Sequence, residues 1–219
     1  MKRALIAGAT GLVGGFCLAE LLASERYVSV TALGRRLIER QHPKLAARVV
    51  DFTALAGAEP VPADHAFCCL GTTLRQAGSR AAFRAVDFDA VLAFARFARR
   101  SGATRLAVVS SLGADRHSRV FYSQVKGEAE TALAGVGFAH LVILRPSLLL
   151  GPRREVRVRE RMAAALAAVV RPVFAGRLRR YRPVHAQTVA RVMVAALGQE
   201  GQGIQILESE EIAAAGGAA

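Results

Sequence analysis

Residues 1–15 read MKRALIAGATGLVGG, and this stretch decides the fold. The apolar run Ala4–Ala7 is typical of a strand that is buried on both faces. It is followed by Gly8, Gly11 and Gly14, and from Leu12 the apolar residues recur at helical spacing. A strand, a glycine-rich turn and a helix in this order predict a loop that binds the pyrophosphate of a dinucleotide.

Each glycine has a role in such a loop. Gly8 permits the tight turn, Gly11 lets the backbone approach the pyrophosphate, and Gly14 lets the helix pack closely on the strand. A competing interpretation is a secretory signal, because Lys2 and Arg3 precede a nearly uncharged stretch. The glycines would weaken a membrane helix, and Glu20 interrupts the apolar run before it reaches about 20 residues. We therefore favour the cofactor loop.

The whole chain has 219 residues and 53% hydrophobic residues, which is typical of one soluble globular domain. Its three cysteines, Cys17, Cys68 and Cys69, are too few for a disulfide framework and lack the spacing of a zinc site. We expect free thiols, a cytoplasmic location and no metal. No second long apolar run is present, so we expect no membrane partner.

The formal net charge of +13 comes from 27 arginines and only three lysines. Arginines are densest between Arg153 and Arg182, but no zinc finger, helix-turn-helix or pattern of aromatic residues alternating with basic ones accompanies them. We expect this patch to face solvent or an anionic ligand, with no specific nucleic-acid partner.

The second strand, predicted at Tyr27–Leu33, ends where a dinucleotide fold selects its cofactor. An acid here would bind the ribose of NAD, whereas an arginine suits the 2′-phosphate of NADP. No acid occurs between Val28 and Ile38, and Arg35 and Arg36 lie at the end of the strand. NADP is therefore favoured over NAD, although two solvated arginines remain an alternative.

The rest of the chain alternates strands with helices, which predicts an α/β fold with a doubly wound parallel sheet. At the end of the third strand, Asp51 can accept a hydrogen bond from adenine, and small residues at 71–73 can line the ribose. Further elements are expected at Arg48–Phe52, His65–Leu70, Ala81–Arg100, Arg105–Val109, Val156–Val170, Val189–Leu197 and Gly203–Leu207.

Tyr122 and Lys126 carry the predicted chemistry. Four residues apart, they lie on one face of a helix. A phenol of pKa ~10 is a poor base near neutrality unless cations stabilise the phenolate, and Lys126 can supply such a charge. In a chain that uses arginine nearly everywhere, this lysine is informative, although an ordinary surface pair is the alternative.

Together, these motifs resemble the short-chain dehydrogenases/reductases over residues 3–207, nearest the atypical subgroup that includes the Tat-interacting-protein oxidoreductases. They are GATGLVG at 8–14, CCLGTT at 68–73, SSLGAD at 110–115, FYSQVKGE at 121–128, LRPSLLLGP at 144–152 and PVHA at 183–186. The resemblance implies a Rossmann fold with strand order 3-2-1-4-5-6, a possible short seventh strand and a small substrate-covering region at about 150–185. We expect one domain, 1–207, followed by a disordered tail at 208–219.

The resemblance also implies roles. Tyr122 would donate or accept the proton, Lys126 would assist it and bind the ribose, and Ser111 would bind the substrate oxygen, although Ser110 remains open. The residues implied at the cofactor, besides Tyr122 and Lys126, are Gly8, Ala9, Thr10, Gly11, Leu12, Val13, Gly14, Arg35, Arg36, Asp51, Phe52, Leu70, Gly71, Thr72, Pro146, Ser147 and Leu148. Position 87, often Asn in extended relatives, is Asp87 here, which puts a complete proton relay in doubt.

Two functions follow. The first is an NADP-dependent oxidoreductase that transfers a hydride between the nicotinamide and a small carbonyl or conjugated substrate. The second is an NADP(H)-responsive binding protein that regulates a partner with little catalysis. A retained Tyr122 and Lys126 favour the enzyme. The apolar face of helix 81–100 also suggests a homodimer.

Overall fold

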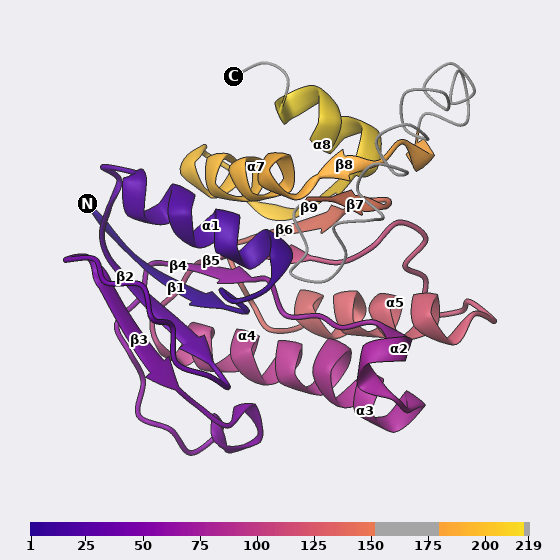
Figure 1. Ribbon diagram of the computed structural model, residues 1–219, viewed down its shortest axis with the longest axis horizontal. Coiled ribbons are helices and arrows are strands. Elements are labelled where there is room, and N and C mark those ends of the chain that lie inside the picture. Colours follow the sequence, from indigo (N-terminus) through magenta and orange to yellow (C-terminus); the bar gives the residue numbers. More distant parts are fainter. Residues whose placement is uncertain (152–179, 217–219) are drawn as a thin grey trace.

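The computed structural model describes residues 1–151 and 180–216. Seven strands form one parallel sheet with the order β3-β2-β1-β4-β5-β6-β9 (Figure 1). This confirms the predicted Rossmann order, and the seventh strand is a full six residues long. The strands are β1 (Lys2–Ala7), β2 (Tyr27–Gly34), β3 (Leu45–Val49), β4 (His65–Cys68), β5 (Arg105–Val109), β6 (His140–Arg145) and β9 (Gly203–Glu208), and β7 (Leu149–Leu150) pairs separately with β8 (Val184–His185).

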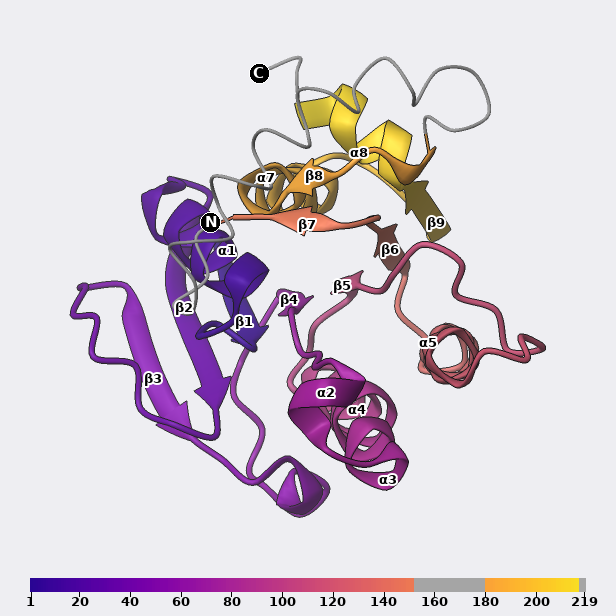
Figure 2. The ribbon, with the colours of Figure 1, turned by 45° about the vertical axis from the view of Figure 1, so that its right-hand side comes forward.

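Helices cover both faces of the sheet. On one face, α1 (Leu12–Ala23) lies beside α7 (Ala186–Gly198), and the two share an apolar core. On the other face, α4 (Val91–Arg100) and α5 (Phe121–Ala134) lie side by side (Figures 1 and 2). The buried strands between them are continuous apolar runs, as expected of a parallel sheet that is covered on both sides.

The predicted helix Ala81–Arg100 is interrupted. It consists of α3 (Arg80–Arg84), a π-helical segment η2 (Ala85–Ala90) and α4. Its large apolar side chains, Phe83, Phe94 and Phe97, are buried within this protein. These three side chains pack inside the protein, whereas Leu92 of the same helix is half-buried. The homodimer suggested through this helix stays a prediction. The short elements before it are η1 (Phe52–Ala54) and α2 (Leu74–Ala77).

The chain does not become a disordered tail after residue 207. β9 continues to Glu208, and α8 spans Ser209–Gly216, so that prediction is wrong over these residues. Glu210 and Glu211 in the first turn complement the helix dipole, and Ile212 is buried in the apolar core on the side of α7, against which α8 packs. Residues 217–219, the helix expected at Val156–Val170 and most of the arginine-rich patch lie outside the described residues, as does most of the substrate-covering region.

A buried polar pair lies at the amino end of the sheet. The Tyr27 hydroxyl and Nδ1 of His65 share a 2.9 Å hydrogen bond, and both side chains are buried. Burial raises the pKa of Tyr27 to about 12, so its O–H can donate to the neutral imidazole. Burial, followed by the charge of Arg105, lowers the pKa of His65 to about 4.

This pair predicts a pH-dependent stability. Below pH 6.5 the unfolded chain takes up a proton on His65, whereas the folded protein does so only near pH 4. We therefore expect the free energy of unfolding to fall between pH 6.5 and 4, by up to about 3 kcal/mol from this residue. Urea unfolding across this range measures it. His65→Phe removes the titrating group. If the free energy of unfolding of this variant still fell with pH as steeply as that of the unmodified protein, the assignment would be contradicted.

Candidate functional site

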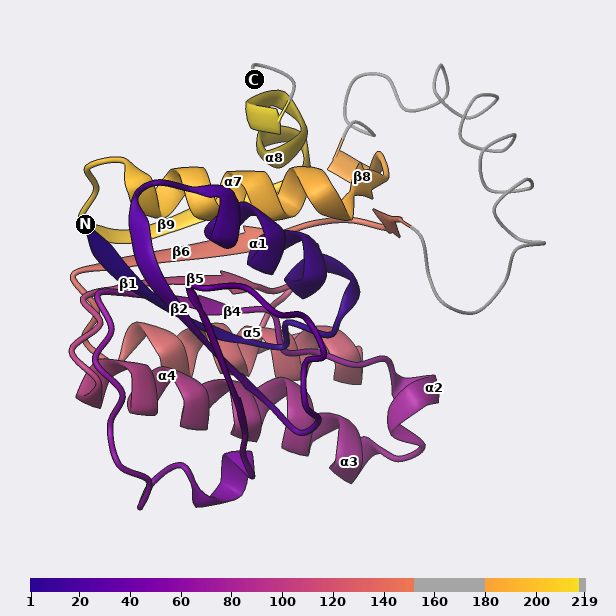
Figure 3. The ribbon, with the colours of Figure 1, turned by 60° about the vertical axis from the view of Figure 1, so that its left-hand side comes forward.

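The candidate site lies at the carboxyl ends of the parallel strands, where open α/β sheets bind ligands. The loops that follow β1, β4, β5 and β6 all begin at this edge. Figure 3 shows the first turn of α1, α2 and β7 together on the right-hand side, beyond the ends of the strands. The sheet thus brings together segments that are up to about 140 residues apart in the sequence.

The glycine loop has the geometry of a phosphate cradle. Gly8 has φ +81°, a conformation that suits glycine, and its carbonyl accepts from the Gly11 amide at 2.9 Å. A Cβ on Gly14 would lie 2.0 Å from the Gly8 oxygen, so only glycine permits this approach. α1 begins at Leu12 with no side-chain cap, which leaves its first amides available to an anion. These residues fit a dinucleotide pyrophosphate.

The predicted adenosine end has two parts. Arg35 and Arg36 follow β2, both are exposed, and no side-chain partner holds either guanidinium within the described residues. Asp51 is exposed and accepts from the Thr53 amide at 2.9 Å, which lowers the pKa of its carboxyl. Phe52 is different, because its ring is buried in the core beneath α4.

Tyr122 and Lys126 do lie on one helix, in the first two turns of α5. The half-buried Tyr122 ring packs 5.2 Å from the ring of buried Phe83. Lys126 is almost fully buried, with Nζ 2.7 Å from Oδ1 of Asp87. Burial acts to lower the pKa of Lys126, but attraction to Asp87, and then to Tyr122, outweighs it and raises the pKa.

The two serines after β5 differ in their surroundings. Ser110 is buried and donates from Oγ to Oε1 of Glu130 on α5. Arg145 also binds Glu130, at 2.5 Å from Nη2 to Oε2, and reaches Glu208 at 3.0 Å. Ser111 is half-buried, and its only hydroxyl contact in the described part of the chain is 3.4 Å to the Leu112 carbonyl. Ser110 is thus engaged in a structural network, whereas the Ser111 hydroxyl is available.

The loop after β6 is held by hydrogen bonds with the first residue of α8. The Ser147 amide donates to Oγ of buried Ser209 at 3.1 Å, and this hydroxyl donates to Oγ of Ser147 at 2.9 Å. The Pro146 carbonyl accepts from the Leu112 amide at 2.9 Å, which ties the loop to that after β5. Leu148 is 64% exposed at this edge. The segment implied at the nicotinamide is therefore held on both sides.

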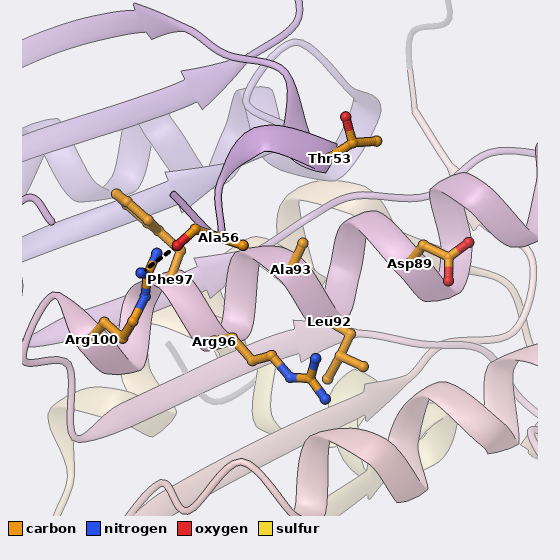
Figure 4. A pocket seen from close by; sticks show the side chains of 8 residues that line it. All are labelled: Thr53, Ala56, Asp89, Leu92, Ala93, Arg96, Phe97 and Arg100. Atoms are coloured by element: carbon orange, nitrogen blue, oxygen red, sulfur yellow. Dashed lines mark hydrogen bonds between the residues drawn. The ribbon is translucent and has the colours of Figure 1, made fainter. Parts of the chain in front are cut away.

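A cavity among the described residues lies away from this edge. It has a volume of ≈ 380 Å³ and lies between α4 and the loop after η1 (Figure 4). Thr53 and Ala56 line one side, and Leu92, Ala93 and Arg96 line the other. Arg100 at its end donates to the Ala56 carbonyl at 2.6 Å. None of the predicted catalytic or cofactor residues lines it.

Sequence reasoning missed two acidic residues of the site. Asp87 was noted only as a departure from the family pattern, and Glu130 was not singled out. The signal for Asp87 was its place on the buried stripe of its helix, four residues after Phe83 and four before Val91. Glu130 was detectable as an acid four residues after Lys126, but its partner Arg145 comes from strand β6.

Comparison with known proteins identifies relatives along nearly the whole chain. Residues 8–200 match the family described as NAD(P)H-binding. Protein HTATIP2 of Rattus norvegicus is 36% identical over 217 residues, covering 96% of this chain and 88% of the rat protein. Protein FMP52, mitochondrial, of Eremothecium gossypii is 35% identical over 218 residues, covering 96% of this chain and 95% of that protein.

Solved structures agree on the fold. MoeE5 in complex with UDP-glucose and NAD superimposes with a TM-score of 0.70 at 17% identity, covering 94% of this chain and 75% of that chain. A UDP-galactose 4-epimerase superimposes with a TM-score of 0.65 at 16% identity, covering 94% of this chain and 76% of that chain. At these identities the likeness concerns the Rossmann fold alone.

The cytoplasmic location predicted from the sequence is contradicted. The FMP52 relatives from Eremothecium gossypii, Coccidioides immitis and Aspergillus terreus are named mitochondrial. The cysteine count separates reducing from oxidising compartments and does not distinguish one reducing compartment from another. Among residues 1–151 and 180–216, no helix is long and apolar enough to cross a membrane.

Proposed function

The chain belongs to the NAD(P)H-binding family, and on this premise we propose that it is an NADP-dependent oxidoreductase of the short-chain dehydrogenase/reductase type. Its substrate would be a small molecule with a carbonyl or conjugated double bond. One observation carries the proposal: Tyr122 and a buried, charged Lys126 share one face of α5, beside the loops that follow β4 and β5.

NADPH, when bound, would supply the hydride to the substrate carbon. Tyr122 would donate its hydroxyl proton to the substrate oxygen, so that the carbonyl becomes an alcohol and a phenolate remains. Lys126 would stabilise this phenolate by its positive charge until a solvent proton restores the phenol. Ser111, whose hydroxyl is available, would orient the substrate oxygen. The glycine loop and the start of α1 would hold the pyrophosphate.

The proposal is tested in two steps. Calorimetry with NADPH should give binding to the unmodified protein. Screening for NADPH oxidation with aldehydes, ketones and quinones should then find a substrate. NADPH binding without turnover on any of them would favour the alternative, in which the protein responds to NADP(H) and regulates a partner.

Cofactor choice gives a sharper prediction. Arg35 and Arg36 are exposed and lack a described partner, so their guanidiniums are free to bind a 2′-phosphate. We expect NADPH to bind more tightly than NADH. The double variant Arg35→Ala, Arg36→Ala should weaken NADPH binding tenfold to a hundredfold, because a charge-assisted contact contributes ~1.5–3 kcal/mol.

NADH is the matched control for this variant, since it lacks the 2′-phosphate. Its affinity should change by less than about twofold, whereas a general distortion of the loop would weaken both cofactors. Equal affinities of the unmodified protein for NADPH and NADH would refute the proposed preference.

A further inference from the structure

Asp87 is a charged residue whose side chain is buried inside the protein. It lies in the π-helical segment η2, between α3 and α4, and only 1% of it is exposed. π-Helical turns inside helices occur frequently at functional sites. A buried carboxylate is costly unless it is paired and hydrogen-bonded, so its partners should explain its presence.

The carboxylate joins two segments of the site. Oδ1 lies 2.7 Å from Nζ of Lys126 on α5, and Oδ2 accepts from the Thr72 amide at 2.8 Å in the loop after β4. Apart from the ion pair, Oδ1 has no hydrogen-bond partner in the described part of the chain. A Cβ on Gly71 would be 3.4 Å from Oδ1 and 3.7 Å from Nζ, so the pair lies directly under this loop.

Asp87 is the anion that balances Lys126. Around the pair, Cys68 of β4 is a neutral thiol, because burial raises its pKa to about 12. Glu130 of α5 is occupied by Arg145. Other charged groups on the packed elements include Arg80 over the Phe121 ring and Arg84, which pairs with Glu128 at 2.5 Å. Asp89 of η2, the arginines Arg96, Arg99 and Arg100 of α4, and Asp51 are all exposed.

We propose that Asp87 is a positioning residue, which holds Lys126 against the Thr72 backbone and keeps its ammonium charged in a buried site. This inference rests on the proposed function, in which the charge of Lys126 stabilises the Tyr122 phenolate. Without the carboxylate, burial is the main influence on Lys126 and favours its neutral form.

The chain is well suited to a direct test, because it contains only Lys2, Lys44 and Lys126. NMR of protein labelled with ¹³C at the lysine Cε atoms should follow the titration of all three. In the unmodified protein, Lys126 should titrate at a higher pH than exposed Lys2. A lower pH than Lys2 would overturn the proposal without any variant, even if Asp87 variants do not fold.

Asp87→Asn tests the residue itself. The amide oxygen can still accept from the Thr72 amide, so the loop contact is retained while the charge is lost. We expect the titration of Lys126 to move at least one pH unit lower, and turnover to fall by ~10–100-fold, as for a misplaced catalytic group. The high-pH limb of the activity profile should also move to lower pH, because Lys126 loses its charge earlier.

Glu128→Gln is the matched control, since it removes the same charge from the pair with Arg84. It should leave both the Lys126 titration and the pH profile unchanged. If Asp87→Asn also leaves both unchanged, the proposal fails. If Lys126 shifts but no substrate is ever turned over by any form, the positioning of Lys126 by Asp87 stands and the proposed function fails.

Discussion

Tyr122→Phe should lower turnover by ~10²–10⁴, the usual contribution of a positioned general acid. Only a hydroxyl is lost, and the ring can keep its packing against Phe83. The fold and the affinity for NADPH should therefore stay nearly unchanged. Steady-state kinetics on the best substrate from the screen, together with calorimetry, separates these two effects.

Tyr27→Phe serves as the control for this variant. Tyr27 is buried at the amino end of the sheet, where its hydroxyl bonds His65, so its loss affects stability rather than turnover. Full turnover by Tyr122→Phe would mean that Tyr122 is not the acid. The proton would then come from water or from the substrate, or the activity would be incidental to a regulatory role.

Gly14→Ala should weaken the binding of NADPH at least a hundredfold. The added methyl group would lie 2.0 Å from the Gly8 oxygen and 3.0 Å from Cα of Ala9, so the loop has to move. Overpacking of this kind costs about 1–3 kcal/mol of stability. Moving the loop also misaligns its amide donors, and losing two charge-assisted hydrogen bonds weakens binding at least a hundredfold. Calorimetry with NADPH and urea unfolding measure the two losses.

Gly15→Ala makes the same change one residue later. Its Cβ would meet the Ala9 oxygen at 3.7 Å, an ordinary contact. Alanine is also favoured over glycine in a helix by about 1 kcal/mol, so this variant should be slightly more stable and bind NADPH normally. Equal NADPH affinities for the two variants would show that the close approach at Gly14 does not shape the loop.

The sequence predicts the sheet well, because each buried strand is a short apolar run and the glycine loop marks the first of them. It also predicts the helix that carries Tyr122 and Lys126, since the two residues are only four apart. It failed at α8, where the composition of residues 213–219 suggested disorder. Ser209 and the acids that follow it are a helix start, and alanine is the best helix former.

Contacts between segments far apart in the sequence could not be predicted from the spacing of residues. The pairing of Asp87 with Lys126 needs η2 and α5 to be placed side by side, and the network of Glu130 needs β6 and β9 as well. The binding of Ser209 to Ser147 likewise joins residues 62 positions apart. The spacing of apolar residues indicates which face of a helix or strand is buried, but not which other element packs against that face.

The packing of α1 against α7 has a consequence for how the chain is made. Leu18 and Leu21 of α1 share one core with Val189 and Met193 of α7, about 170 residues later. During synthesis, the apolar face of the first helix therefore stays exposed until α7 has also left the ribosome. Contacts of such long sequence separation slow folding, and the exposed face is open to aggregation or to a chaperone meanwhile. The helix that follows the cofactor loop thus reaches its final packing only after α7 has been synthesised.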